Sequence, residues 1–205
     1  MTGSHWDISW HRSIGRDSFW SPPHIAIYLC GVLAGISCGY VILSTTFRRD
    51  SPLRDCSVRI WGFRAPLGAF ISAWGGIAMI TSAPFDNWWH NAYGLDVKIL
   101  SPPHMVLALG IFAVHLGALI LILGRMNREQ GALRTRLMAA FLYVRGMMLV
   151  CLTVLLMEEA SRTGMHTVHF YWLIALVAPA MLAGSARATG SVSYTHLTLP
   201  TILRV

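Results

Sequence analysis

Long apolar stretches alternate with short polar connectors along this chain of 205 residues. A continuous apolar stretch of about 20 residues is long enough to cross a bilayer as a helix. In lipid, a helix satisfies its own backbone groups, so helix is favoured over strand. Such stretches lie near residues 24–44, 65–83, 102–124, 137–157 and 168–186. The pattern therefore predicts an all-α, polytopic transmembrane helical bundle of about five spans, formed by a single membrane domain over residues 1–190.

The stretch at residues 65–83 is short and rich in glycine. Gly68, Gly75 and Gly76 lie within it. Small residues let membrane helices approach each other closely. We therefore expect this span to pack tightly against a neighbouring helix.

Composition and charge support a membrane location and exclude a soluble enzyme. Hydrophobic residues make up 55% of the chain and charged residues 12%, whereas soluble domains carry about 25% charged residues. The net charge of +7 does not indicate nucleic-acid binding, because the basic residues cluster in two connectors between spans. Five spans place both connectors on one side, which the positive-inside rule makes cytoplasmic, so the N-terminus is expected outside. These residues are Arg48, Arg49, Arg54, Arg59 and Arg64 in one connector, and Arg125, Arg128, Arg134 and Arg136 in the other.

The opposite, outer side receives histidines and carboxylates, and an internal repeat organises them. Both copies read D-x-x-W-H-x-x-x-G-x-D, then three or four residues, then S-P-P-H, and both run directly into a span. Repeats in membrane proteins often bracket a binding site. The carboxylate and two imidazoles of each copy are Asp7, His11 and His24 over residues 7–24, and Asp86, His90 and His104 over residues 86–104.

The spacing within each copy gives these residues a common direction. Asp and His four positions apart lie on one face of a helix. In the S-P-P-H block, Ser is a good N-cap and Pro is tolerated at the first helical position, so the histidine falls in the first turn of the span. The loop between can bring that histidine back to the Asp/His pair. Each copy therefore predicts a three-ligand site with room for water or substrate, suited to copper, non-haem iron or zinc.

Further polar residues are candidates for additional roles. His115 lies near mid-membrane, where it could relay protons or support the metal; a neutral histidine hydrogen-bonded to a neighbouring helix is the favoured interpretation. Six outer-side residues could complete or bridge a metal site: Asp17, Asp96, Glu158, Glu159, His166 and His169. For Glu158, Glu159, His166 and His169, a solvated loop is the slightly favoured interpretation.

The first copy also resembles a known family. The segment D-I-S-W-H-R-S-I-G-R-D-S-F-W-S-P-P-H, residues 7–24, resembles the metal-site segment of the C subunit of copper membrane monooxygenases, the particulate methane and ammonia monooxygenases. That segment has the form D-x-x-W-H, R-D-[TS], [TS]-P-x-H. The resemblance implies that Asp7, His11 and His24 are copper ligands. It also implies a second metal site in the other copy, where Asp86 stands in place of the family's asparagine.

What the resemblance implies about function goes beyond a metal site. It implies a subunit of a copper-dependent membrane monooxygenase that hydroxylates a small apolar substrate or ammonia with O2. Such a protein needs other membrane subunits and an electron donor, and it lies in a bacterial inner or intracytoplasmic membrane with its metal site toward the extracytoplasmic side. The residues alone leave two alternatives open. One is a membrane protein that transports or loads copper or zinc, and the other is a non-catalytic structural subunit.

The C-terminal residues 191–205 do not fit the pattern of the rest of the chain. The segment S-V-S-Y-T-H-L-T-L-P-T looks like a translated sequencing adapter, and hydropathy breaks at this point. We therefore exclude these residues from fold reasoning. We expect that they are not native and that the natural chain continues differently after residue 190.

Overall fold

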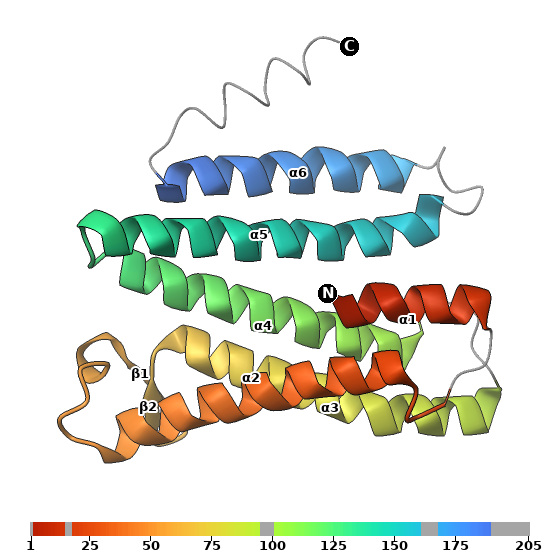
Figure 1. Cartoon of the computed structure of the whole chain (residues 1–205), viewed down its shortest axis with the longest axis horizontal. Helices are drawn as coiled ribbons and strands as arrows, with labels where there is room; N and C mark the ends of the chain where they lie inside the picture. Colours follow the sequence, from red (N-terminus) through yellow and green to blue (C-terminus); the bar gives the residue numbers. More distant parts are fainter. Residues whose placement is uncertain (1, 15–17, 95–100, 161–167, 190–205) are drawn as a thin grey trace, which may run out of the picture. The chain divides into compact units, whose positions relative to one another are not determined.

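The chain is predominantly helical in the computed structural model, which describes residues 2–14, 18–94, 101–160 and 168–189 (Figure 1). The described residues form two compact units, residues 1–121 and residues 122–205, and one helix runs on from the first unit into the second. The elements of the described chain are α1 (Thr2–Ser13), α2 (Pro22–Phe47), a 3-10 turn (Arg54–Cys56), β1 (Val58–Ile60), β2 (Phe63–Ala65), α3 (Leu67–Tyr93), α4 (Pro102–Met126), α5 (Gly131–Ala160) and α6 (Val168–Thr189).

Four segments are long and apolar enough to cross a membrane. They are Pro22–Phe47, Leu67–Tyr93, Pro102–Met126 and Gly131–Leu152, and they coincide with the first four spans expected from the sequence. The fifth expected span coincides with α6, whose described apolar part, Ile174–Thr189, is shorter than a full span. The all-α, polytopic membrane fold is thus confirmed, while the fifth crossing stays a prediction.

Large apolar side chains cover the outside of α2. Leu33, Ile36 and Tyr40 are 63%, 66% and 67% exposed. An apolar surface running the length of a helix is unfavourable in water, because apolar area left exposed forfeits about 25 cal/mol per Å². A bilayer removes that penalty, so this face of α2 is a lipid-facing surface.

Close glycine contacts hold α3 between its neighbours, as expected from its small residues. A methyl group added at Gly75 would lie 2.7 Å from the carbonyl oxygen of Gly110 on α4. One added at Gly76 would lie 2.7 Å from the carbonyl oxygen of Gly31 on α2. Backbone meets backbone on both sides of α3, which is the arrangement that small residues permit in membrane helices.

The helix α3 extends beyond the end expected from hydropathy. The apolar stretch stops at Ala83, but the helix continues through Pro84 to Tyr93. Hydropathy marks where apolar side chains end, whereas a helix continues as long as its backbone bonds form. This extension has a consequence for the site, because it places Asp86 and His90 on the same helix as the span.

The connector after α2 is a short β-hairpin, where the sequence predicted only an arginine-rich loop. Strands β1 and β2 pair antiparallel, with Ile60 opposite Phe63. Ala65 is fully buried and joins a small core with Ala69 and Phe70 of α3, against which Ile60 packs. In Figure 1 the hairpin lies at the end of the first unit opposite to α1.

The second unit pairs α5 with α6 through an arginine inside the span. Arg145 donates from Nε to the carbonyl oxygen of Met181 at 3.1 Å and from Nη2 to that of Ala180 at 3.4 Å. Its guanidinium carbon also lies 5.8 Å from the centre of the Phe141 ring. The charged group is thus held by carbonyl dipoles and an aromatic face of its own unit.

Candidate metal centre

The first carboxylate–imidazole trio is assembled by α1 and the start of α2. Asp7 and His11 lie one turn apart on α1. Ser21 is the N-cap of α2, and the following prolines place His24 in the first turn, as the sequence predicted. Ser21 uses its backbone rather than its side chain, because its carbonyl oxygen accepts from Ile25 at 3.1 Å while its hydroxyl makes no capping bond.

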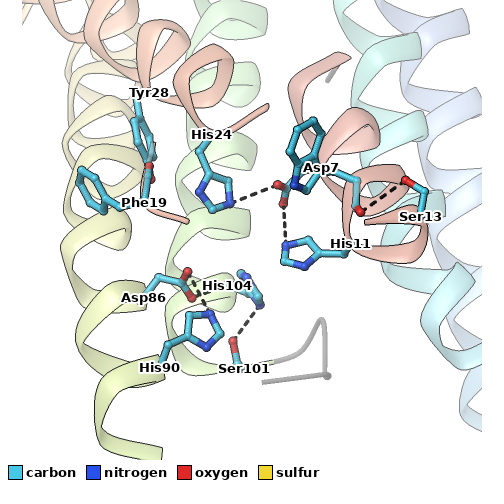
Figure 2. Close-up of polar contacts among 11 residues, drawn as sticks. Asp7, His11, Ser13, Phe19, His24, Tyr28, Asp86, His90, Ser101 and His104 are labelled. Atoms are coloured by element: carbon cyan, nitrogen blue, oxygen red, sulfur yellow. Dashed lines mark hydrogen bonds and ion pairs between the residues drawn. The ribbon is translucent and has the colours of Figure 1, made fainter. Parts of the chain in front are cut away.

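The three side chains of this first trio converge on one point (Figure 2). His24 Nε2 lies 3.1 Å from Asp7 Oδ1, and His11 Nε2 lies 3.8 Å from Asp7 Oδ2. One ligand atom from each residue lies within 4.8 Å of the others. The Asp7 and His24 side chains are only 13% and 10% exposed. The start of α2 therefore places His24 beside the Asp7/His11 pair, as expected.

The second trio repeats this arrangement at the end of α3 and the start of α4. His90 Nε2 lies 3.3 Å from Asp86 Oδ2, and His104 Nε2 lies 3.6 Å from Asp86 Oδ1. All three side chains are largely buried, at 15% exposure for Asp86 and His90 and 23% for His104. The sequence repeat is thus a structural repeat in which a histidine on the same helix and a histidine at the start of the next helix flank one carboxylate.

Two contacts orient the imidazoles of the second trio. His104 Nδ1 shares a hydrogen bond of 2.8 Å with the hydroxyl of Ser101, and His90 Nδ1 lies 3.3 Å from the carbonyl oxygen of Gly94. Because a carbonyl only accepts, this contact requires the proton on His90 Nδ1. In neutral His90, the Nε2 lone pair then faces the Asp86 carboxylate. Two acceptors at this distance repel each other unless a cation lies between them or the imidazole is protonated.

Burial of the carboxylates makes the electrostatics of both trios alike. Asp7 Oδ1 and Asp86 Oδ1 are shielded from solvent, and neither makes a hydrogen bond of good geometry within the described part of the chain. A buried anionic oxygen is unfavourable unless a cation or a donor compensates it. Imidazole nitrogen and carboxylate oxygen together form a donor set for copper, iron or zinc. The first trio, whose ligand atoms lie within 4.8 Å of one another, therefore fits a divalent transition metal, while the second trio supplies the same donor types around Asp86.

Both trios lie at the same end of the first unit. In Figure 1, α1, the start of α2, the end of α3 and the start of α4 meet there, away from the arginine-bearing hairpin. Figure 2 shows the side chains of both trios pointing into this region. A scattered arrangement, or trios at opposite ends of the helices, would have removed the basis for a metal centre.

The remaining candidates are only partly placed. His115 Nδ1 donates to the carbonyl oxygen of Ile111 at 2.7 Å, one turn earlier in its own helix; the favoured expectation of a bond to a neighbouring helix stays a prediction. His115 also lines a small, mostly apolar cavity of about 40 Å³ with Cys30 and Met79. Asp17, Asp96 and His166 lie outside the described residues, as do the side chains of Glu158, Glu159 and His169 and the C-terminal segment 191–205.

Sequence reasoning missed the supporting role of Ser101. The S-P-P-H pattern suggested a helix cap for this serine, whereas its hydroxyl holds the His104 ring. The signal was present, because serine and histidine stand three positions apart at a helix start and so share a face. The Gly94 carbonyl that orients His90 carried no such signal, since any residue supplies a carbonyl.

Comparisons with known proteins leave the site to be interpreted from its own residues. No protein family, curated protein or solved structure matches this chain.

Proposed function

We propose that this protein is an integral membrane subunit that binds copper through Asp7, His11 and His24 and serves a monooxygenase. One observation carries the proposal: two histidines from different helices turn the same ring nitrogen toward one buried carboxylate. Asp86, His90 and His104 form the second site of the same kind. Iron and zinc are the alternative metals for this donor set.

The spacing of the donor atoms supports a metal of ordinary size. Ligand atoms about 2.0–2.2 Å from a metal lie roughly 3.3 Å apart at a tetrahedral angle. In the first trio, His24 Nε2 lies 3.1 Å from Asp7 Oδ1 and His11 Nε2 lies 3.8 Å from the other oxygen, Oδ2. One ligand atom from each of the three residues lies within 4.8 Å of the others. Three protein ligands leave a coordination position for O2 or substrate, as in other catalytic metal sites.

Copper is favoured over the alternatives by two arguments. Copper(II) binds such N/O sites more tightly than the other divalent first-row metals, and residues 7–24 resemble a copper-binding segment. The chemistry that bound copper supplies is the activation of O2. The balanced reaction for a substrate R–H is R–H + O2 + 2e⁻ + 2H⁺ → R–OH + H2O. Its two electrons must come from a donor outside this chain.

The protein's own residues have separate tasks in this proposal. Asp7 would offset part of the charge of a bound cation, and His11 and His24 would hold it through their ring nitrogens. Helix starts and ends fix these side chains on rigid elements, which limits their movement during turnover. The trios lie at the end of apolar helices, so a small apolar substrate can arrive from the bilayer. Ammonia is the alternative substrate, and further membrane subunits are the expected partners.

The metal sites are tested first by binding. Purified protein should bind copper at close to two ions per chain, and His24→Ala should remove about one of them. His5→Ala is the matched control, because His5 is an exposed histidine on α1 outside the trio. Equal copper binding by His24→Ala and the control would refute the assignment of the first site.

Function is tested separately, in membranes that contain the whole complex. Membranes with the intact chain should incorporate ¹⁸O from ¹⁸O2 into product, and Asp7→Asn should abolish this while the chain remains in the membrane. Copper binding without any incorporation of ¹⁸O into product would refute the monooxygenase role and indicate a structural metal centre. Copper flux into proteoliposomes that depends on both trios would instead identify a transporter.

A further inference from the structure

The hairpin β1–β2 places two positive charges directly opposite each other. Arg59 and Arg64 are cross-strand partners, and like charges in this relation destabilise a hairpin. The backbone N–H and C=O of Arg64 form hydrogen bonds with α2 instead of β1. The N–H donates to Thr46 Oγ1 at 2.8 Å, and the carbonyl oxygen accepts from that hydroxyl at 3.1 Å. Arg59 and Arg64 are therefore a non-hydrogen-bonded pair, in which side chains stand closest together.

Both arginines face away from the protein. On the other face of the hairpin, Ala65 is fully buried and Ile60 packs on the same core, while Val58 and Phe63 are 38% and 41% exposed. Side chains alternate along a strand, so Arg59 and Arg64 share the outward face, and both are exposed. Within the described residues, no carboxylate lies within ion-pair distance of either arginine, whereas Arg48 in the same connector lies 3.9 Å from Asp50.

The tip of the hairpin lies against the apolar side of α3. Trp61 is 79% exposed, and its ring centre is 5.5 Å from that of Trp74 in an edge-to-face contact. Trp74 lies two turns into α3, roughly 10 Å along the helix from its start. Trp61 also has a positive φ of 49°, which is unfavourable for a bulky residue. The tip is thus held beside a helix long and apolar enough to span a membrane, and it exposes a tryptophan, a residue type enriched at membrane interfaces.

We propose that this hairpin is a binding site for the phosphate of an anionic phospholipid, held between Arg59 and Arg64, with the lipid chains beside Trp61 and Trp74. The paired guanidiniums supply several donors directed to one side, which is the pattern that chelates a phosphate. The exposed tryptophans continue the apolar surface of α3, which a water-soluble anion would not need. Charge and apolar surface together therefore select a lipid over a free phosphate.

The proposal is tested by lipid binding to the full chain in nanodiscs or detergent. The probes are phosphatidylglycerol and phosphatidylcholine, with bound lipid measured by native mass spectrometry. Arg59→Gln with Arg64→Gln should weaken phosphatidylglycerol binding about thirtyfold, because the charge-assisted hydrogen bonds from both guanidiniums to the bound phosphate are lost. The matched control, Arg49→Gln with Arg128→Gln, removes the same charge from exposed positions and should change binding by less than about threefold.

Further arms separate a specific site from diffuse attraction. Arg59→Lys with Arg64→Lys keeps the charge but removes the planar donor pairs, so most of the affinity should be lost. Full retention by the lysine variant, or equal loss in the matched control, would overturn the proposal. Inorganic phosphate should not displace the lipid; displacement at millimolar phosphate would also overturn it. Unchanged Tm values of the hairpin variants in the same detergent would show that they fold.

Discussion

Replacing Gly75 by alanine tests how closely α3 and α4 pack, and therefore how the second trio is held in place. The added methyl would lie 2.7 Å from the Gly110 carbonyl oxygen and 2.8 Å from the Val114 amide nitrogen. Both neighbours are backbone atoms, so no side chain can rotate away. Ordinary contacts begin at 3.4 Å, so the helices must separate by roughly 0.7 Å along a close-packed interface.

The magnitude follows from two opposing effects. Overpacking a well-packed interface costs about 1–3 kcal/mol, and a backbone clash belongs at the upper end. Alanine in place of glycine within a helix stabilises that helix by about 1 kcal/mol. Gly75→Ala should therefore be destabilising by about 2 kcal/mol, which lowers Tm by roughly 4–8 °C for a chain of this size.

Gly39 on α2 provides the matched control. A methyl group at Gly39 meets nothing within 4 Å, so Gly39→Ala keeps the helix gain without the clash and should be stabilising by up to about 1 kcal/mol. Thermal unfolding of both variants in the same detergent, followed by circular dichroism, gives the comparison. Equal Tm values for the two variants would refute the close contact between α3 and α4.

Two further substitutions probe the second trio and the second unit. Ser101→Ala removes the hydroxyl that orients His104, and it should weaken metal binding at that trio by about 10–100-fold while the first trio is unaffected; a copper titration with unchanged affinities would contradict this. Arg145→Lys keeps the charge but cannot direct two donors to the carbonyl oxygens of Met181 and Ala180. It should therefore lower the free energy of unfolding by about 1–2 kcal/mol. An unchanged denaturant midpoint would show that these two hydrogen bonds of the guanidinium do not contribute to stability.

Much of the fold could be predicted from the sequence because a helix that crosses a bilayer needs a continuous apolar stretch of about 20 residues. Helix lengths and apolar stretches coincide for the first four spans. The extension of α3 to Tyr93 could not be predicted in this way, because hydropathy does not register a helix that leaves the apolar layer. The hairpin was missed for a related reason: its pattern covers only three residues per strand, too few for alternation to stand out among arginines.

The candidate site was more predictable than its details. The repeat identified both trios because spacing along a helix fixes which side chains share a face, and the structure brings each set together. Which nitrogen of each histidine faces inward depends on contacts from loops and turns. The Gly94 carbonyl and the Ser101 hydroxyl set this in the second trio, and only three-dimensional contacts reveal such pairs.

X-ray absorption spectroscopy on the copper-loaded protein tests the central claim most directly. The account predicts a shell of only nitrogen and oxygen near about 2.0 Å, with imidazole scattering that decreases when His11 and His24 are both replaced by alanine. Sulfur near about 2.3 Å, or imidazole scattering that is unchanged in the double variant, would contradict a metal centre formed by Asp7, His11 and His24.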